Sequence, residues 1–260
     1  MDVLTPRTLQ EALALKAEHS DAVPIQGGTD VMVELNFDRG RPPALLNLNE
    51  VAELRGWSRE NGMLWLGSGL TYTEAMEPPL AQLLPALAEA SRTVGGPQIR
   101  NRGTVGGNLG TASPAGDALP PLLVCGTDVK LASVRGERVV PLQEFIVGPK
   151  RNVLADDELI LGVSVAAGES RQTFMKVGPR NAMVIAVVSL ALRVDDELRA
   201  AFGSAGPVPT LVRASLDETG SFPDQVAEAA SPIDDVRGSA AYRRHALRVL
   251  TKRALERCLA

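Results

Sequence analysis

The chain has 260 residues, of which 45% are hydrophobic and 22% are charged, and its formal net charge at pH 7 is −4. A chain of this size can fill one domain of ordinary size and a smaller one, and its scattered Lys and Arg residues exclude a general attraction to nucleic acid or anionic lipid. No apolar run is long enough to span a bilayer, and residues 1–10 lack the pattern of a secretory signal, so we expect a cytoplasmic protein.

The first predicted elements are a helix, a strand and a glycine loop. Thr8-Leu9-Gln10-Glu11 has the spacing of a capping box, in which the Thr hydroxyl and the Glu carboxylate exchange hydrogen bonds with the first N–H groups of a helix. Residues 23–25 indicate a short buried strand that runs into Gly27-Gly28-Thr29-Asp30, and residues 31–35 indicate a helical turn behind it. A strand, a loop and a helix in this order suit anion binding.

Short strands and helices follow in the middle of the chain. Residues 72–93 are helical in pattern but contain Pro78, Pro79 and Pro85, which predicts two helices in that stretch. The other elements that we expect here are strands at 44–48 and 63–67, a short helix at 121–125, and strands at 129–134, 137–141 and 158–165.

The pattern changes from residue 172 onward. We expect an antiparallel three-stranded sheet from strands at 174–177, 184–194 and 198–202, with residues 195–197 as the last turn. An exposed loop at 217–221 and two helical stretches follow, and the last helix covers 239–259. The domain boundary is predicted near residues 168–170.

Paired glycines occur twice, in Gly27-Gly28 and in the segment 104–110, where Gly106-Gly107 is followed by Asn108. Loops of this composition can bring backbone N–H groups against phosphate oxygens. The first pair alone could be an ordinary turn whose Thr29 and Asp30 cap a helix. The dense glycines of the second segment indicate the close approach of a ligand or of another backbone. Neither segment has the glycine order of a Rossmann fingerprint or the Lys-Ser/Thr of a Walker loop.

Five segments carry a resemblance to a known family, and they are residues 24–32, 94–109, 112–117, 174–180 and 238–244. In these segments the chain resembles the FAD-binding medium subunit of the molybdenum hydroxylases, which include xanthine dehydrogenase and carbon monoxide dehydrogenase. The resemblance implies an α+β fold with a two-part FAD-binding domain over 1–168, similar to the vanillyl-alcohol oxidase and p-cresol methylhydroxylase type. Its subdomains would cover about 1–55 and 56–168, and a C-terminal α+β domain would cover 169–260.

The resemblance also implies which residues contact FAD. It puts both glycine loops on the pyrophosphate, Asp117 at the ribityl and phosphate region, and Lys176 beside the flavin ring, where a cation stabilises the anionic reduced form. Two apolar residues, Val94 and Ile160, would pack on the isoalloxazine. The full implied set is Pro24, Ile25, Gln26, Gly27, Gly28, Thr29, Asp30, Val31, Val94, Gly95, Thr104, Val105, Gly106, Gly107, Asn108, Thr111, Ser113, Asp117, Ile160 and Lys176.

Several of these residues have an ordinary structural interpretation as well. Asp117 has the setting of a helix N-cap, Lys176 that of a surface lysine whose stem lies on apolar surface, and the two apolar residues that of the core. Arg100 and Arg102, beside the second loop, could be solvated charges. They could also be contacts for a partner subunit or for the phosphate of a pyridine nucleotide.

The cysteines and histidines restrict the chemistry of the chain. Cys125 and Cys258 lack any ligand spacing, so they build neither an iron–sulfur cluster nor a zinc site, and we expect two reduced structural thiols. His19 and His245 fall in predicted helices far from the glycine loops, so FAD would be bound non-covalently. The sequence offers no metal site and no catalytic acid–base group of its own.

By the resemblance, the chain is an electron-transfer subunit. It would take electrons from a small [2Fe-2S] iron–sulfur subunit, assemble with a large molybdopterin subunit, and pass electrons from reduced FAD to NAD, a quinone or oxygen. The alternatives are a standalone flavin reductase or oxidase of the same fold, and a flavin-free interaction scaffold. Gln26 and Asn36 depart from the family pattern, in which a small residue and a basic residue are common at these places.

Overall fold

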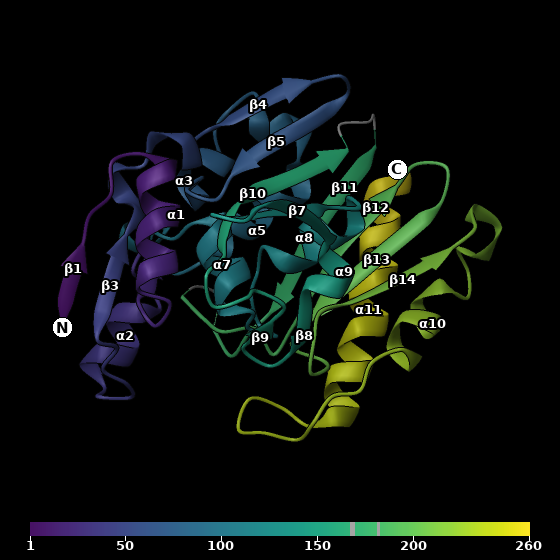
Figure 1. Cartoon of the computed structure of the whole chain (residues 1–260). Coiled ribbons are helices and arrows are strands. Elements are labelled where there is room, and N and C mark those ends of the chain that lie inside the picture. The colour runs from purple at the N-terminus through teal and green to yellow at the C-terminus, as the bar shows by residue number, and fades with distance from the viewer. Residues whose placement is uncertain (167–169, 181–182) are drawn as a thin grey trace.

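The computed structural model describes residues 1–166, 170–180 and 183–260 as an α+β molecule (Figure 1). Its N-terminal part is a parallel sheet with the strand order β1 (Asp2–Leu4), β3 (Ala44–Asn47) and β2 (Val23–Ile25). The helices α1 (Leu9–Glu18) and α2 (Val31–Asn36) and the 3-10 turns η1 (Leu48–Glu50) and η2 (Ala52–Leu54) complete this part. Ala12 and Leu46 share a buried core with Leu159 and Leu161 of the next sheet, so the N-terminal part is packed firmly on the rest.

A five-stranded antiparallel sheet forms the middle of the molecule. Its order is β4 (Trp57–Glu60), β5 (Met63–Gly67), β10 (Leu159–Ala166), β6 (Asp128–Ser133) and β7 (Gly136–Pro141). The largest core packs on it and includes Val105, Leu119 and Val163. The remaining elements of this part are α3 (Tyr72–Ala75), α4 (Leu80–Leu83), α5 (Pro85–Thr93), α6 (Pro97–Arg100), α7 (Val105–Thr111), α8 (Leu119–Val124), α9 (Leu142–Phe145), β8 (Ile146–Gly148) and β9 (Arg151–Asn152).

The C-terminal sheet is antiparallel, in the order β11 (Arg171–Val177), β12 (Val188–Val194), β13 (Leu198–Gly203) and β14 (Thr210–Ala214). Side chains alternate between the two faces of this sheet, so neighbouring residues of one strand pack into different hydrophobic cores. Ala191 lies in the core with the middle sheet, whereas Leu190 lies in the core with α10 (Phe222–Glu228) and α11 (Ala240–Leu259). The 3-10 turn η3 (Leu216–Glu218) precedes α10 and covers part of the predicted loop at 217–221.

Three expectations for this sheet are wrong. It has four strands instead of three, β11 begins at Arg171 instead of residue 174, and β12 begins at Val188 instead of residue 184. The strand β14 follows Pro207 and Pro209 and lies half-exposed at the edge of the sheet, so its sequence has the character of a loop. The predicted domain boundary falls on residues 168 and 169, which lie outside the described residues.

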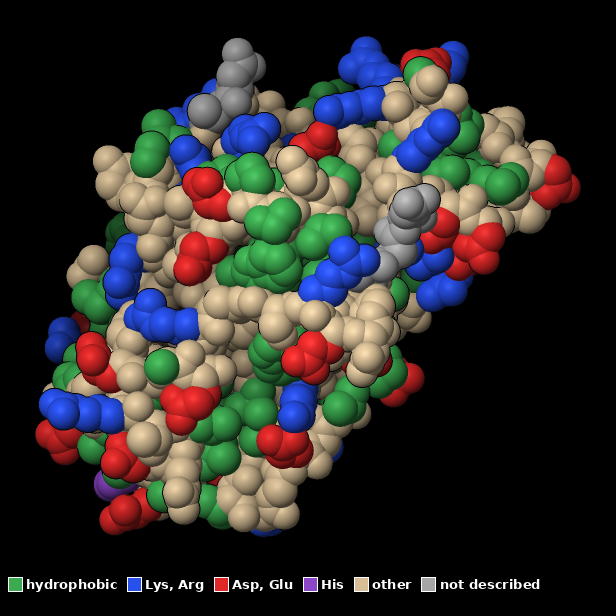
Figure 2. All heavy atoms as spheres, turned by 90° about the horizontal axis from the view of Figure 1, so that it is seen from above, with side chains coloured by type: hydrophobic (Ala, Val, Ile, Leu, Met, Phe, Trp, Pro, Cys, Tyr) green, Lys and Arg blue, Asp and Glu red, His purple; other side chains and the backbone are tan. Residues whose placement is uncertain are grey.

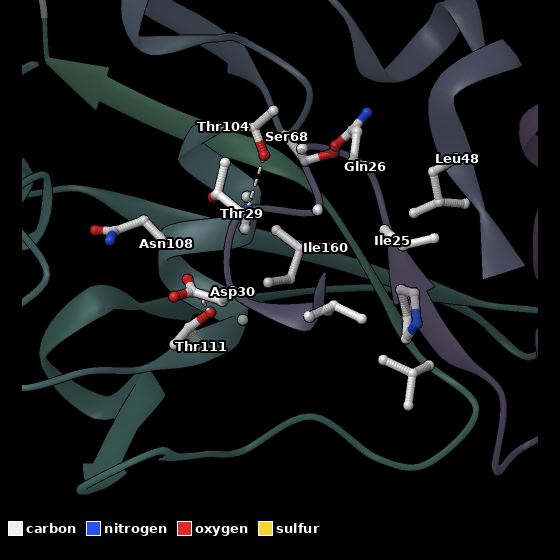
Figure 3. Close-up of a pocket in the computed structure, with 18 of the residues that line it drawn as sticks. Ile25, Gln26, Thr29, Asp30, Leu48, Ser68, Thr104, Asn108, Thr111 and Ile160 are labelled. Atoms are coloured by element: carbon white, nitrogen blue, oxygen red, sulfur yellow. Dashed lines mark hydrogen bonds between the residues drawn. The ribbon is translucent and has the colours of Figure 1, made fainter. Parts of the chain in front are cut away.

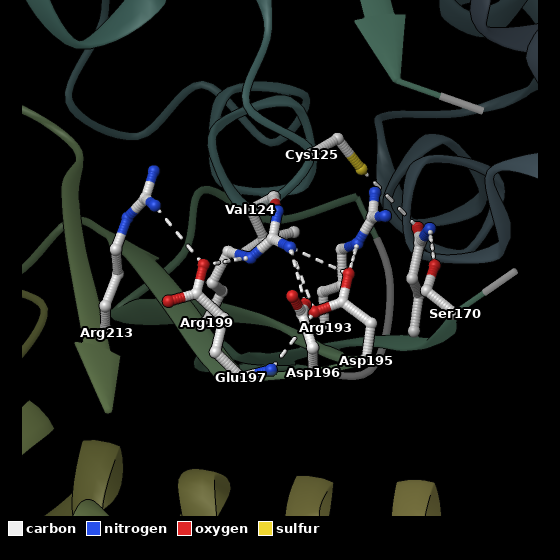
Figure 4. A network of polar contacts seen from close by, with 10 residues as sticks. Val124, Cys125, Ser170, Arg193, Asp195, Asp196, Glu197, Arg199 and Arg213 are labelled. Atoms are coloured by element: carbon white, nitrogen blue, oxygen red, sulfur yellow. Dashed lines mark hydrogen bonds and ion pairs between the residues drawn. The ribbon is translucent and has the colours of Figure 1, made fainter. Parts of the chain in front are cut away.

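A polar network ties the C-terminal sheet to α8 (Figure 4). The Asp195 carboxylate, in the turn between β12 and β13, accepts from Arg193 Nε at 2.8 Å and from Arg199 Nη2 at 2.7 Å. Arg199 also donates to the carbonyl of Val124, the last residue of α8, at 3.2 Å. The buried Cys125 thiol lies beside this network, and burial raises its pKa, so it remains a neutral thiol.

Helix boundaries in the first half also differ from the predicted ones. The Thr8 hydroxyl accepts from Glu11 N at 3.2 Å, but the Glu11 carboxylate accepts from Arg7 N, so the capping box is incomplete. Residues 72–93 form three helices instead of two, because Pro85 starts a separate one. His19 is the residue after α1 and lies outside it, whereas His245 lies in α11 as expected.

The surface carries both charges side by side. On the face shown in Figure 2, Lys and Arg side chains are interspersed with Asp and Glu side chains. Within the described ranges, no helix is long and apolar enough to cross a membrane. In the same ranges, no group of three or more His, Cys, Asp or Glu side chains is placed to hold a metal ion.

Candidate functional site

A cavity of about 400 Å³ lies where the N-terminal part meets the middle sheet, within the usual size range of small-molecule sites (Figure 3). Both glycine loops and β10 contribute to its wall. The residues predicted from the sequence that line it are Pro24, Ile25, Gln26, Gly27, Gly28, Thr29, Asp30, Val31, Thr104, Gly106, Gly107, Asn108, Thr111 and Ile160. Two loops that are far apart in the sequence therefore meet at one site.

The first glycine loop presents free hydrogen-bond donors to this cavity. Among the described residues, no acceptor bonds the backbone N–H groups of residues 27–31. Gly28 has φ of +73°, a left-handed conformation that glycine adopts without strain. A Cβ on Gly27 would stand 2.3 Å from the carbonyl oxygen of Arg102, so this glycine is required by a neighbouring backbone. Successive free N–H groups of this kind form an anion-binding concavity.

The second glycine loop uses its N–H groups internally. The N–H groups of Val105 and Gly106 donate to Leu70 O and Ser68 O at 2.9 and 2.8 Å, and Gly107 N donates to Thr104 Oγ1 at 3.0 Å. A Cβ on Gly106 would stand 2.5 Å from the Ser68 side chain, whereas a Cβ on Gly107 would approach only Thr104 Oγ1, at 3.1 Å. The glycines of α7 thus allow close packing on one side and leave a smooth surface on the other.

Three buried polar atoms of residues that line the cavity have no partner within the described part of the chain. They are Ser68 Oγ, Gln26 Nε2 and Asn108 Oδ1. Buried polar groups are normally hydrogen-bonded, so such groups in a cavity wall indicate a polar ligand. Gly69 makes room for the Gln26 side chain, since a Cβ on Gly69 would stand 2.4 Å from Gln26 Nε2. Free N–H groups and a free hydroxyl together fit a ligand that bears phosphate groups.

Charged side chains of the rim connect the two sides of the cavity. Asp30 accepts from the Thr111 hydroxyl at 3.0 Å, and Lys150 pairs with Glu34 at 2.6 Å. The N-cap interpretation of Asp30 is therefore incomplete: the residue precedes α2, but its side chain makes no capping hydrogen bond. Burial raises the pKa of Tyr72, with Asp117 and Asp30 adding to the shift, so this cavity-lining phenol stays neutral.

Asp117 and Lys176 form a buried ion pair outside this cavity, with Lys176 Nζ 2.6 Å from Asp117 Oδ2. Their side chains are 10% and 6% exposed, so the interpretation of Lys176 as a surface lysine is wrong. The N-cap interpretation of Asp117 is also wrong, because Ala118 is the N-cap of α8 and no side chain caps that helix. Burial raises the pKa of Asp117 although Lys176 opposes the shift, and Asp117 Oδ1 has no partner among the described residues.

The other predicted residues do not line the cavity. Val105 is fully buried in the main core, and the Ser113 hydroxyl accepts from Ala115 N at 3.3 Å. Val94 ends α5, and Gly95 has φ of +44° and packs against Ile99.

Arg100 and Arg102 are both bonded to backbone, so the interpretation as solvated charges is wrong. Arg100 donates to the carbonyls of Val94 and Gly95 at 3.2 and 2.9 Å. Arg102 donates to Gln26 O at 3.2 Å and to Asn49 Oδ1 at 3.1 Å, which fastens the first loop to the second.

Sequence reasoning missed several residues of the cavity wall. They are Val23, Glu34, Leu48, Ser68, Tyr72, Gly110, Lys150, Leu154, Glu158 and Leu159. Most are ordinary core or surface types without a local motif. Ser68 offered one signal, since it lies in the Gly67-Ser68-Gly69 segment at the end of β5.

The sequence is similar to known proteins over most of its length. The family model described as the FAD binding domain in molybdopterin dehydrogenase matches residues 1–166. The chain is 31% identical to the xanthine dehydrogenase FAD-binding subunit of Escherichia coli O157:H7, over 97% of this chain and 94% of that one. It is 34% identical to the nicotinate dehydrogenase FAD-subunit of Eubacterium barkeri, over 75% of this chain and 69% of that one.

Solved structures share the fold. A chain of carbon monoxide dehydrogenase from Hydrogenophaga pseudoflava superposes with a TM-score of 0.91 at 24% identity, covering 100% of this chain and 97% of that one. A chain of quinoline 2-oxidoreductase from Pseudomonas putida 86 gives a TM-score of 0.92 at 24% identity, covering 99% of this chain and 96% of that one.

Proposed function

The chain belongs to the family of FAD binding domains of the molybdopterin dehydrogenases, and on this basis we propose that it is the electron-transfer subunit of a molybdenum hydroxylase complex. Its cofactor is FAD, and the chain is a subunit of an oxidoreductase. One observation carries the proposal. The N–H groups of residues 27–31, which have no acceptor in the described protein, and the glycines of α7 line the same cavity.

The two loops hold the phosphate end of FAD in different ways. The backbone N–H groups of residues 27–31 donate to the pyrophosphate, because they have no acceptor in the described protein. Gly107 lets the cofactor approach α7 closely, and the hydroxyls of Thr104 and Ser68 supply further hydrogen bonds. FAD is bound non-covalently in this proposal, since no histidine or cysteine is among the described residues that line the cavity.

The buried pair Asp117–Lys176 belongs to the flavin end of the site in this proposal. Bound FAD supplies the redox chemistry, since it accepts single electrons and can return them as a pair. The Lys176 ammonium stabilises negative charge on the reduced ring, and the Asp117 carboxylate moderates that effect because it neutralises the same cation. Burial of both side chains excludes water, which strengthens each electrostatic contribution.

The partners of the chain follow from the kind of complex. We infer a small [2Fe-2S] iron–sulfur subunit as electron donor, a large molybdopterin subunit, and NAD or another acceptor, in the cytoplasm. The free thiols of Cys125 and Cys258 fit a reducing compartment. The division into an FAD-binding domain of 1–168, with subdomains of about 1–55 and 56–168, and a C-terminal domain of 169–260 is supported by the family match, which ends at residue 166.

Purification tests this proposal directly. The isolated chain is expected to show a flavin spectrum and to release free FAD on treatment with acid or heat. Purification from the native host is expected to bring down a cysteine-rich small subunit and a large molybdenum subunit, and the chain alone is expected to reduce only artificial acceptors with NADH. A single-chain enzyme active on an aldehyde, a purine or carbon monoxide would refute the role as a subunit.

A further inference from the structure

The cavity is lined by more acidic than basic side chains. Asp30, Glu34 and Glu158 are its acids, and Lys150 is the only basic residue among its described lining residues. The pyrophosphate of FAD adds two negative charges at neutral pH. Backbone N–H groups offer hydrogen bonds but no net charge, so the cavity needs a cation to balance the phosphates.

Two of the three carboxylates are already satisfied. Glu158 binds Arg138 with both oxygens at 2.7 Å, and this contact lowers the pKa of Glu158. Asp30 accepts from the Thr111 hydroxyl. Glu34 is therefore the acid that engages Lys150, with Lys150 Nζ 2.6 Å from Glu34 Oε1.

The backbone of Lys150 is fixed while its side chain is free to change partners. Its N–H donates to Ala112 O at 3.0 Å, next to the C-terminal end of α7, and its φ is +55°. The Lys150 and Glu34 side chains are 64% and 50% exposed, and an exposed ion pair of this kind is weak. The ammonium of Lys150, which lies between β8 and β9 beside the end of α7, thus reaches Glu34 of α2, the helix that follows the first glycine loop.

We propose that Lys150 is the charge partner of the FAD pyrophosphate and that Glu34 pairs with the Lys150 ammonium in the absence of FAD, in competition with the phosphate. This inference rests on the proposed function, since it assigns a residue to the same cofactor site. When FAD binds, the ammonium exchanges the Glu34 carboxylate for a phosphate oxygen. The two members of one ion pair therefore have opposite effects on affinity.

The test measures the dissociation constant of FAD for the full chain by flavin fluorescence, at low and at high salt. Lys150→Met is expected to raise the dissociation constant at least about tenfold and to reduce its dependence on salt, because a charge-assisted contact is lost. Glu34→Gln is expected to leave it unchanged or to lower it, because Lys150 is released for the phosphate. Lys150→Arg, which keeps the charge, is expected to retain most of the affinity.

A matched control is Lys130→Met, which removes an ion pair of the same 2.6 Å length between β6 and β7, outside the cavity. It is expected to leave the dissociation constant unchanged. An unchanged value for Lys150→Met would overturn the inference. Equal weakening by Lys150→Met and Glu34→Gln would overturn it as well, since the pair would then act as a simple bridge. A wild-type chain that binds no FAD would instead refute the proposed function.

Discussion

The two glycine loops look alike in sequence but differ in what their backbones offer. Within the described part of the chain, the N–H groups of residues 27–31 have no acceptor, whereas Val105, Gly106 and Gly107 donate theirs to Leu70, Ser68 and Thr104. In the first loop, Gly28 adopts a left-handed conformation and Gly27 leaves room for the carbonyl oxygen of Arg102. In the second, it permits a helix to pack against β5 on one side and leaves Gly107 open on the other.

This difference shows that a pair of glycines does not by itself identify a phosphate loop. What decides is whether the N–H groups have acceptors inside the protein, and that depends on residues distant in the sequence. Under the proposed function, the first loop donates hydrogen bonds to phosphate and the second provides a surface for close approach. Substitutions in the two loops should separate these roles.

The largest effect is expected where a glycine meets another backbone. Gly27→Ala and Gly106→Ala would each place a Cβ within 2.5 Å of existing atoms, and overpacking of this kind costs about 3 kcal/mol of unfolding free energy. Thermal denaturation of the apo-protein measures it. The control is Gly40→Ala, where nothing lies within 4 Å, and full thermal stability of both variants would contradict the packing role.

A smaller effect on stability but a large effect on affinity is expected at Gly107. Its Cβ would meet only Thr104 Oγ1, at 3.1 Å, and Gly107 lies in a helix without positive φ. Gly107→Val should therefore fold with nearly unchanged stability, because the higher helix propensity of valine offsets the contact with Thr104. The branched side chain would occupy the open face of α7, so FAD affinity is expected to fall about a hundredfold or more. Equal FAD affinity in the variant and the wild type would remove Gly107 from the site.

The smallest effect on binding is expected beyond both loops, at the buried pair. Lys176→Met should lower the midpoint potential of the flavin and Asp117→Asn should raise it, because the two changes remove opposite charges. In Lys176→Met, burial raises the pKa of Asp117 and no lysine opposes the shift, so the carboxyl takes up a proton at higher pH than in the wild type. The drop in the flavin potential is therefore greatest at high pH, where Asp117 is ionised and its negative charge has no partner. Spectroelectrochemical titration at two pH values measures both shifts, and potentials that stay constant would exclude the pair from the flavin end.

The sequence predicted those parts of the fold and site that depend on local pattern. The strand 23–25 and the helix behind it were predicted, although the strand is half-exposed instead of buried. The long C-terminal helix was predicted from apolar spacing, and the glycine motifs located most of the cavity wall. The edge strand β14 was missed because its local composition is that of a loop. Lys150 and Ser68 were missed because only the tertiary fold brings them beside residues 27–31.

Amide hydrogen exchange at the two loops shows most directly which of them donates to phosphate. We expect the N–H groups of residues 27–31 to exchange rapidly in the apo-protein and to be protected when FAD is added. The N–H groups of Val105, Gly106 and Gly107 are expected to be protected in both states, since their acceptors lie within the protein. Exchange at residues 27–31 that FAD leaves unchanged would contradict the assignment of the first loop as the phosphate donor.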